Sequence, residues 1–291
     1  MRTDLSTPEF QRFLKEIDDH FVCVVGDLLQ WKVLERPQIK VGSGNVVLRF
    51  KTQEGLFIFR VPQHSQQQLR RVALAYQHFG PSGLMPEPIY RDGKCVLERY
   101  VEGLPLSDRA TDAELVALAQ KLALVHAVPA DRFGVLSHGS TGIHADADAS
   151  YAPLKVESSD DSTLEDAALT PDESSAFDAM AHRAALVPVA VRRAPCFLGH
   201  GDLLRNNIVL GAQGVYFIDW DRIGSYPREH DFVFLTDADL SPRQQALVLA
   251  HYPYALDPVL LDWYALRRVV GGWGISRRAK LALAVRHGLL P

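Results

Sequence analysis

The sequence contains few cysteines and no cysteine pair. Its three thiols, Cys23, Cys95 and Cys196, lie far apart among 291 residues, and no C-x-x-C motif is present. The usual motif for zinc or dithiol chemistry is therefore missing. We interpret all three cysteines as buried thiols.

Long apolar runs and a strong charge of one sign are also absent. No segment approaches the roughly 20 apolar residues that cross a bilayer, and Met1–Leu5 begins no export signal. The 31 basic and 35 acidic residues give a net charge of -4, without a basic cluster interleaved with aromatic residues. We expect a cytoplasmic protein with neither a membrane nor a nucleic-acid partner. The sequence carries no signal for an oligomeric state.

What the sequence does contain is the composition of a globular protein. With 47% hydrophobic and 23% charged residues, the chain can bury one large core or two modest ones. Nothing in it indicates global disorder.

Two polar motifs in the second half carry the strongest functional signal. One places Asp202 and Asn207 five positions apart, in His200-Gly201-Asp202-Leu203-Leu204-Arg205-Asn206-Asn207. The other places Asp219 after an apolar strand, Val215-Tyr216-Phe217-Ile218. In protein kinases a loop Asp accepts the proton of the substrate hydroxyl, while a loop Asn and a later Asp hold Mg²⁺. Asp202, Asn207 and Asp219 suit these roles in that order, although the first string alone could equally be an Asp-capped turn with a buried His.

The segment that begins at Asp219 resembles a known family. Residues 219–232 are similar to the segment that starts with the metal-binding Asp in aminoglycoside phosphotransferases, with four further residues in register: Arg222, Gly224, Arg228 and Asp231. The likeness extends to choline kinases and similar small-molecule kinases, whose catalytic loop also follows H-x-D-L-L-x-x-N. It covers the chain from Val41 to Phe232 and is weaker in the C-terminal helices.

The resemblance implies an α+β, bilobal, protein-kinase-like fold. Residues 1–100 would form a small N-terminal lobe with an antiparallel sheet that binds the nucleotide, and residues 101–291 a larger, mostly helical lobe that binds the acceptor. It also implies a kinase that transfers the γ-phosphoryl group of ATP or GTP to a hydroxyl. The acceptor could be an aminoglycoside, another antibiotic, an amino alcohol, a sugar or a pathway intermediate.

The same resemblance implies roles for single residues. Asp202 would be the catalytic base, and His200 would brace its loop through nearby backbone atoms. Asn207 and Asp219 would hold Mg²⁺. Asp231 is expected to anchor the helix that follows it.

The first hundred residues predict a helix over 8–20 and then a hairpin of strands 46–50 and 56–61. Before the hairpin stands Gly42-Ser43-Gly44-Asn45, whose small residues would let backbone N–H groups approach phosphate oxygens. The alternative is an ordinary glycine-rich turn.

The resemblance places Arg60 at the strand position where these kinases usually carry a Lys for the α- and β-phosphates. Such kinases pair that cation with a Glu on the next helix, but residues 65–79 contain no acid. Arg60 could be oriented by a neutral side chain such as Gln67 or by an acid from another element; otherwise the lobe binds nucleotide weakly.

A family-like hinge follows at Cys95–Leu106, with Glu98 and Tyr100 as nucleotide-binding candidates. Its backbone would meet the adenine edge, so the two side chains are expected to pack and to face solvent.

Beyond residue 105 the pattern becomes helical, and His126 at the end of one helix is expected to be a packing residue. Residues 138–175 are polar, acidic and small, which predicts a surface insertion. Its acids Glu157, Asp160 and Asp161 could hold a cationic acceptor, but a solvated mobile loop is the favoured interpretation.

Four further residues are candidate acceptor contacts. Asp221 and Arg222 follow the metal-binding Asp, and Trp263 or Trp273 could contact a cation, as aromatic rings of this lobe do in choline kinases. The alternative is that the two tryptophans belong to the core.

Two other functions stay open. A non-catalytic nucleotide-binding protein would explain Arg60 and the missing helix acid. A metal-dependent phosphohydrolase could use the same Asp-rich loops, although clustered His ligands are scarce.

Overall fold

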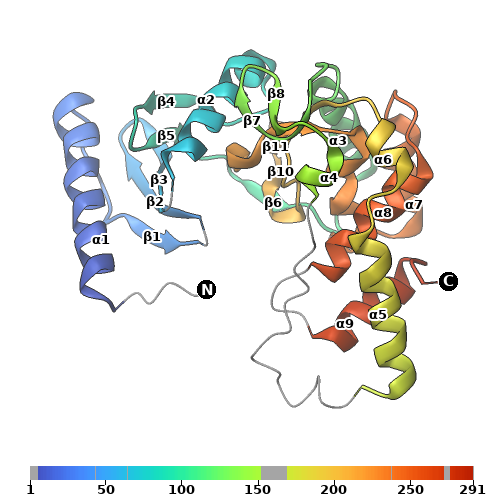
Figure 1. Cartoon of the computed structure of the whole chain (residues 1–291). Coiled ribbons are helices and arrows are strands. Elements are labelled where there is room, and N and C mark those ends of the chain that lie inside the picture. The colour runs from blue at the N-terminus through green and yellow to red at the C-terminus, as the bar shows by residue number, and fades with distance from the viewer. Residues whose placement is uncertain are drawn as a thin grey trace. The chain divides into compact units, whose positions relative to one another are not determined.

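The computed structural model describes residues 6–42, 44–63, 65–151, 169–236, 238–271 and 276–290. The chain divides into two compact units, Met1–Glu102 and Gly103–Pro291 (Figure 1). The boundary expected from the sequence, between residues 100 and 101, lies two residues earlier. No helix in the described ranges is both long and apolar enough to cross a membrane.

An antiparallel sheet of five strands, in the order β1-β2-β3-β5-β4, forms the centre of the N-terminal unit. The predicted hairpin is part of it, because β2 and β3 pair along their whole lengths down to the turn between Thr52 and Gly55. The strands span Gln38–Val41 (β1), Asn45–Thr52 (β2), Gly55–Pro62 (β3), Pro88–Arg91 (β4) and Val96–Arg99 (β5).

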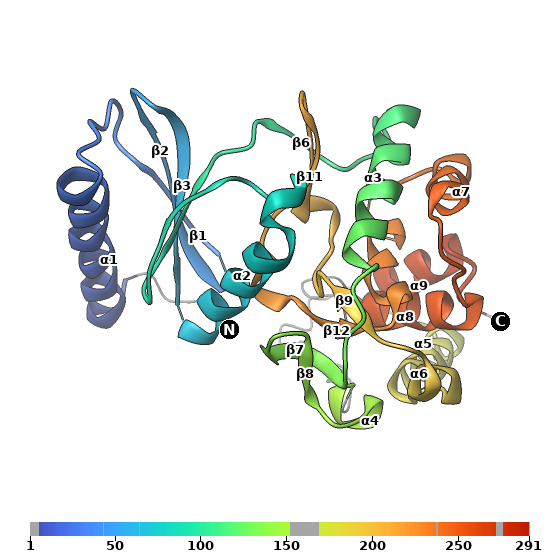
Figure 2. The ribbon, with the colours of Figure 1, turned by 90° about the horizontal axis from the view of Figure 1, so that it is seen from above.

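One helix lies on each face of this sheet (Figure 2). Helix α1 (Pro8–Phe21) is capped by Thr7 and continues into a π-helical turn, Val22–Leu28, past the expected end at residue 20. It packs on alternate residues of β2 and β3, namely Val46, Leu48, Phe50, Phe57, Phe59 and Val61. The residues between these point to the other face, where α2 (Gln66–Phe79) lies.

The structure corrects the interpretation of the cysteines. Cys95 is buried and Cys196 is half-buried, but Cys23 is exposed. Cys23 lies in the π-helical turn, whose inward side is occupied by Val24 and Val25. The prediction of a buried thiol was therefore wrong for Cys23.

The C-terminal unit combines two small sheets with helices. The sheets have the orders β11-β10-β6 and β8-β7-β12-β9. Their strands are Gly103–Pro105 (β6), Phe133–His138 (β7), Thr141–His144 (β8), Phe197–Gly199 (β9), Ile208–Gly211 (β10), Gly214–Phe217 (β11) and Gly224–Tyr226 (β12). The helices are Asp112–Val125 (α3), Ala147–Ser150 (α4), Pro171–Ala185 (α5), Val189–Arg193 (α6), Pro242–His251 (α7), Pro258–Val270 (α8) and Arg277–Arg286 (α9).

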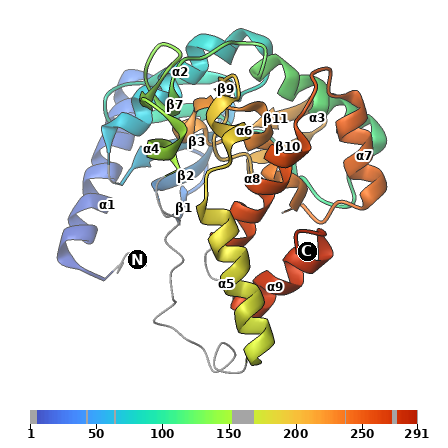
Figure 3. The ribbon, with the colours of Figure 1, turned by 45° about the vertical axis from the view of Figure 1, so that its right-hand side comes forward.

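Two apolar clusters hold α4, α5, α6, α8 and α9 in place. One gathers around Trp263 and Tyr264 of α8. The other joins α5, α8 and α9, which lie close together in Figure 3. Helix α8 belongs to both clusters and is therefore a central element of this unit.

Part of the predicted surface insertion belongs to the fold. Strand β8 pairs with β7, α4 follows it, and Ala147 and Tyr151 are only 1% and 8% exposed. At the other end, α5 already begins at Pro171. The interpretation as a mobile loop was wrong for these parts, because they form a strand and helices, and composition does not reveal such pairing and packing. The acids expected to be on the loop, Glu157, Asp160 and Asp161, lie outside the described residues.

Candidate active site

The two polar motifs meet at one end of a hairpin. Strands β10 and β11 pair antiparallel with Ile208 opposite Phe217, and just outside them the Ile218 N–H donates to the Asn207 carbonyl oxygen at 2.9 Å. Asp219 follows Ile218 directly. The strand register therefore brings Asn207 and Asp219 to the same edge.

His200 ties the loop of residues 200–207 to this hairpin. Its side chain is buried; Nε2 donates to the Ile218 carbonyl oxygen at 2.9 Å, and Nδ1 accepts from the Asp202 N–H at 3.3 Å. These two bonds assign the proton to Nε2. The Trp220 ring packs against the imidazole, with centroids 4.6 Å apart. Both ring nitrogens are thus engaged with backbone atoms.

Asp231 holds the backbone of the same loop. Its carboxylate is 1% exposed and accepts from the N–H groups of His200 at 2.6 Å and Gly201 at 2.9 Å. Burial by itself raises the pKa of Asp231, but hydrogen bonds from His126 and His230 outweigh burial and hold this pKa well below its ordinary value. Asp231 was expected to anchor the following helix, whereas these bonds anchor the loop.

Gly201 lies where the loop comes closest to the turn after β11. Its φ is +80°, and a Cβ at this position would lie 2.1 Å from the Arg222 carbonyl oxygen. A glycine avoids both the left-handed strain and this overlap. The close approach therefore depends on Gly201.

Asn207 and Asp219 offer oxygen atoms of the kind that Mg²⁺ prefers. Asn207 Nδ2 donates to the Asp202 carbonyl oxygen at 2.8 Å, so the amide is oriented and Oδ1 is its ligating end. Asp219 has a left-handed backbone, with φ 66° and ψ 56°. Such a conformation costs roughly 1–3 kcal/mol for a residue other than glycine and is enriched at functional sites. The donor set fits a magnesium ion.

In the N-terminal unit, the predicted phosphate loop is the turn between β1 and β2. The Gly42 N–H donates to the Asn45 carbonyl oxygen at 2.9 Å, and the two strands pair up to this turn. Gly44 lies in the same turn, and Ser43 lies outside the described residues. The described part of the loop is thus a hairpin tip.

The acid that is missing from residues 65–79 comes from a neighbouring strand. Arg60 on β3 and Glu98 on β5 form an ion pair, with 2.9 Å between Nη2 and Oε1. Tyr76 of α2 donates its hydroxyl to Glu98 Oε2 at 2.6 Å. Arg60 and Glu98 are 8% and 6% exposed. Of the possibilities left open for orienting Arg60, the structure shows the acid from another element, whereas the exposed Gln67 accepts from Arg71 at 3.4 Å.

The two hinge side chains differ in their surroundings. Glu98 is buried in this ion pair, so the expectation that it faces solvent was wrong: strand pairing turns it toward Arg60. Tyr100 is half-buried; the Arg49 guanidinium lies 4.4 Å from its ring centre, and its N–H donates to the Leu56 carbonyl oxygen at 2.9 Å.

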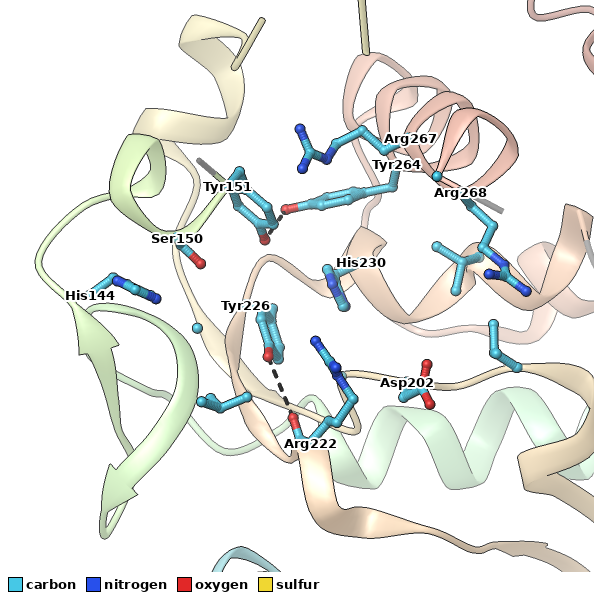
Figure 4. A pocket seen from close by; sticks show the side chains of 16 residues that line it. His144, Ser150, Tyr151, Asp202, Arg222, Tyr226, His230, Tyr264, Arg267 and Arg268 are labelled. Atoms are coloured by element: carbon cyan, nitrogen blue, oxygen red, sulfur yellow. Dashed lines mark hydrogen bonds between the residues drawn. The ribbon is translucent and has the colours of Figure 1, made fainter. Parts of the chain in front are cut away.

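A cavity of 410 Å³ opens beside Asp202 in the C-terminal unit (Figure 4). Residues of β7, the loop 200–207, the turn after Asp219 and α8 line it. Three arginines belong to its wall: Arg222, Arg267 and Arg268. The volume lies in the range of small-molecule sites, which is about 300–1,000 Å³.

Two tyrosines make a further part of the wall. The hydroxyls of Tyr151 and Tyr264 are hydrogen-bonded at 2.8 Å. Burial raises the pKa of both phenols well above its ordinary value, so both are neutral. They offer polar, uncharged surface to whatever binds there.

The predicted acceptor contacts fall into different places. Arg222 lines the cavity, whereas Asp221 beside it does not. Trp263 is 5% exposed, donates Nε1–H to the Leu186 carbonyl oxygen at 2.8 Å and belongs to the core. Trp273 lies outside the described residues.

The sequence of residues 35–267 matches the family described as APH, phosphotransferase enzyme family. The chain belongs to this phosphotransferase family. The family resemblance of the two loop motifs is thereby confirmed. No curated protein matches the sequence significantly.

Solved structures of similar fold include three kinds of phosphotransferase. Choline kinase LicA from Streptococcus pneumoniae has a TM-score of 0.60 and 14% identity, over 94% of this chain and 92% of that chain. Spectinomycin phosphotransferase APH(9)-Ia, in complex with ADP and spectinomycin, has a TM-score of 0.60 and 14% identity, over 85% of this chain and 84% of that chain. Macrolide 2'-phosphotransferase MphH from Brachybacterium faecium has a TM-score of 0.56 and 14% identity, over 92% of this chain and 94% of that chain. These similarities confirm the expected α+β fold of the protein-kinase-like kind.

Most of the cavity wall of this phosphotransferase was missed by the sequence analysis. Tyr264, Arg267, Arg268 and Gly271 line it, and their spacing of three, four and seven places them on one face at the end of α8. This stripe is present in the sequence. It is polar, however, and a search for apolar periodicity does not find it.

Proposed function

We propose that this phosphotransferase transfers the γ-phosphoryl group of ATP or GTP to a hydroxyl of a small molecule bound beside Asp202. The convergence of Asp202, Asn207 and Asp219 from two separate motifs carries the proposal. Structures of similar fold add support for nucleotide use. Spectinomycin phosphotransferase was solved with ADP, and aminoglycoside phosphotransferase APH(4)-Ia with AMP-PNP and hygromycin B.

Asp202 is the proposed base. Its side chain lines the cavity, its N–H is held by His200, and its carbonyl oxygen accepts from Asn207 Nδ2 and from the Leu204 N–H. A carboxylate in a loop fixed in this way can accept the hydroxyl proton as the acceptor oxygen bonds to the γ-phosphorus. The bond from the γ-phosphorus to the bridging oxygen breaks, and the nucleoside diphosphate leaves.

Each unit by itself offers candidate groups for the donor. Asn207 and Asp219 would bind Mg²⁺, which would neutralise charge on the phosphates. Arg60, fixed by Glu98, would fork across two phosphate oxygens, and the backbone of the turn at Gly42 would contact others.

Two observations favour the kinase proposal over the alternative functions. The helix without an acid suggested a non-catalytic protein, but Glu98 supplies the missing partner of Arg60. A phosphohydrolase needs a cluster of metal ligands at its site. In the described residues one group of three ligating His, Cys or acidic side chains occurs, His20, Asp92 and Cys95, and it belongs to the N-terminal unit.

The test is mass spectrometry of the protein with Mg-ATP or Mg-GTP and a panel of hydroxylated antibiotics, amino alcohols, sugars and amino-acid derivatives. Asp202→Ala should abolish the phosphorylated product while nucleotide binding is kept. Asp219→Ala should weaken binding of the Mg-nucleotide itself. Asp178→Ala, on the exposed side of α5, is the matched control and should behave like the parent.

Normal turnover by the Asp202→Ala variant would remove Asp202 from the role of base. The kinase proposal fails if the parent protein forms no product and shows no nucleotide-dependent thermal shift.

A further inference from the structure

We propose that the acceptor of this phosphotransferase carries an anionic group, a phosphate or a carboxylate, in addition to the hydroxyl that is phosphorylated. The inference rests on the proposed kinase function and names the substrate class of the same cavity. Arg222 and Arg267 would bind the anion, and Asp202 would meet the hydroxyl.

The charges of the cavity wall have one predominant sign. Among the described residues that line it, Asp202 is the single acid and stands against three arginines. Tyr151 and Tyr264 of the wall are neutral, because burial keeps the pKa of both phenols high. If Asp202 takes part in proton transfer, the rest of the described wall offers only positive or neutral groups. Such a wall attracts anions and repels cations.

Arg222 extends its guanidinium into this cavity (Figure 4). Its carbonyl oxygen accepts from the Tyr226 hydroxyl at 3.4 Å, so the short turn that carries it is held through the backbone. Within the described part of the chain, its guanidinium pairs with no acid. The planar donor group is therefore available for two oxygens of one phosphate or carboxylate.

Arg267 reaches the cavity from α8 and is partly buried. It donates to the Ala184 carbonyl oxygen at 2.9 Å, and its guanidinium lies 5.0 Å from the Trp263 ring centre and 5.5 Å from that of Tyr151. Burial lowers the pKa of Arg267, and the acids of the described ranges form no ion pair with it. A half-buried cation with one bonded carbonyl keeps several N–H donors for an anion.

This wall contrasts with the acceptors first expected. Glu157, Asp160 and Asp161 suggested a cationic acceptor, but the described side chains around Asp202 have the opposite sign. A positively charged acceptor would have to approach three arginines. An acceptor with its own negative charge would instead be oriented by them, with its hydroxyl left for Asp202.

The experiment compares acceptors that share a carbon skeleton and differ in charge. One set is glucose 6-phosphate, glucuronate, glucose and glucosamine; the other is glycerol 3-phosphate, glycerate, glycerol and 3-aminopropane-1,2-diol. Sulfate serves as an anion without a skeleton. Affinities are measured by calorimetry and thermal shift, and products by mass spectrometry with Mg-ATP. Comparison of the phosphate and carboxylate members of each set shows which of these two anionic groups the cavity prefers.

Three variants accompany the parent protein. Arg222→Gln removes the charge, and Arg222→Lys keeps the charge but loses the fork. Arg243→Gln is the control, because Arg243 is exposed on α7, pairs with Asp112 at 2.6 Å and does not line the cavity.

We expect at least one anionic member to bind the parent and the Arg243→Gln variant at least tenfold more tightly than its neutral counterpart, with the amine weakest. Arg222→Gln should lose this preference and its thermal shift with sulfate, and Arg222→Lys should regain part of both.

Several results would overturn the inference. These are a preference for neutral or amino acceptors, absence of binding by sulfate and all anionic members, or an unchanged preference in Arg222→Gln. Weaker Mg-ATP binding by Arg222→Gln with unchanged acceptor preference would assign Arg222 to the donor instead. The parent protein could also bind anions through Arg222 and yet neither bind Mg-ATP nor form product. That result would refute the kinase function, while the cavity would remain an anion site.

Discussion

The buried ion pair between Arg60 and Glu98 has an exposed counterpart in the same sheet. Arg99 and Glu87 also approach to 2.9 Å, but their side chains are 46% and 61% exposed, against 10% and 7% for Arg60 and Glu98. Substituting Gln for Glu98 or for Glu87 removes one carboxylate at the same distance from an arginine. The two pairs differ in burial and in the Tyr76 hydroxyl that also donates to Glu98, so the comparison measures the effect of the buried environment as a whole.

The expected magnitudes follow from the two environments. Unit charges 2.9 Å apart attract by about 6 kcal/mol at an effective dielectric constant of about 20, and by about 1.4 kcal/mol in water. The amide introduced by Glu98→Gln would keep one acceptor oxygen but remove the negative charge that lies 2.9 Å from the buried Arg60 guanidinium. We therefore expect Glu98→Gln to lower the free energy of unfolding by about 3 kcal/mol, near the lower end for a broken buried pair. Glu87→Gln should lower it by less than about 1 kcal/mol.

Urea unfolding gives the free energies, and native-state hydrogen exchange of peptides from β3 and β5 shows whether the loss is local. The double variant Arg60→Gln with Glu98→Gln should recover part of the loss, because the buried positive charge is then removed together with the negative one. Equal effects of Glu98→Gln and Glu87→Gln, or no recovery in the double variant, would refute the argument from burial.

Other predictions concern the loop anchor, a glycine and the thiols. Because the pKa of Asp231 is lower in the folded protein, ionised Asp231 contributes stability that is complete above about pH 4 and is lost as the pH falls through the folded-state pKa. Urea unfolding of the parent between pH 2 and 5 should therefore show a pH-dependent loss of unfolding free energy that the Asp231→Asn variant lacks. Parallel pH profiles of the two proteins would contradict this. Gly201→Ala should lower the free energy of unfolding by several kcal/mol, because the new Cβ overlaps the backbone at Arg222. Gly139→Ala, which has a positive φ but open space around it, should lower the free energy of unfolding by about 1–2 kcal/mol in the same assay. Equal losses would show that the overlap at Gly201 relaxes. A thiol reagent at pH 8 should modify Cys23 rapidly and the other two thiols slowly, since Cys23 is exposed and burial raises the pKa of Cys196 to about 11; rapid reaction of a second thiol would contradict the burial pattern.

The part of the site that could be predicted from sequence is the part built from neighbouring residues. Asp202, Asn207 and Asp219 lie within one short stretch, and a single hairpin register brings the last two together. The spacing of these motifs in the sequence therefore nearly determines their proximity in space. The strands of the β2–β3 hairpin were predictable for the same reason, since a short turn joins two apolar runs.

Features that depend on distant residues could not be predicted. Glu98 reaches Arg60 across 38 positions because β3 pairs with β5, and a search of the next helix alone finds no partner. The regular structure within residues 138–151 likewise depends on the pairing of β8 with β7. Trp263 was a candidate contact by residue type, but packing places it in the core.

The sequence by itself determined the family, the fold class and the polar groups proposed for phosphoryl transfer, because these reside in contiguous motifs with characteristic spacing. The tertiary structure decided the orientation of Arg60 and the charge of the cavity beside Asp202. That cavity gathers β7, the loop 200–207, Arg222 and the face of α8 that carries Arg267 and Arg268. Its charge is a sum over side chains far apart in sequence, and their proximity exists only after the chain has packed.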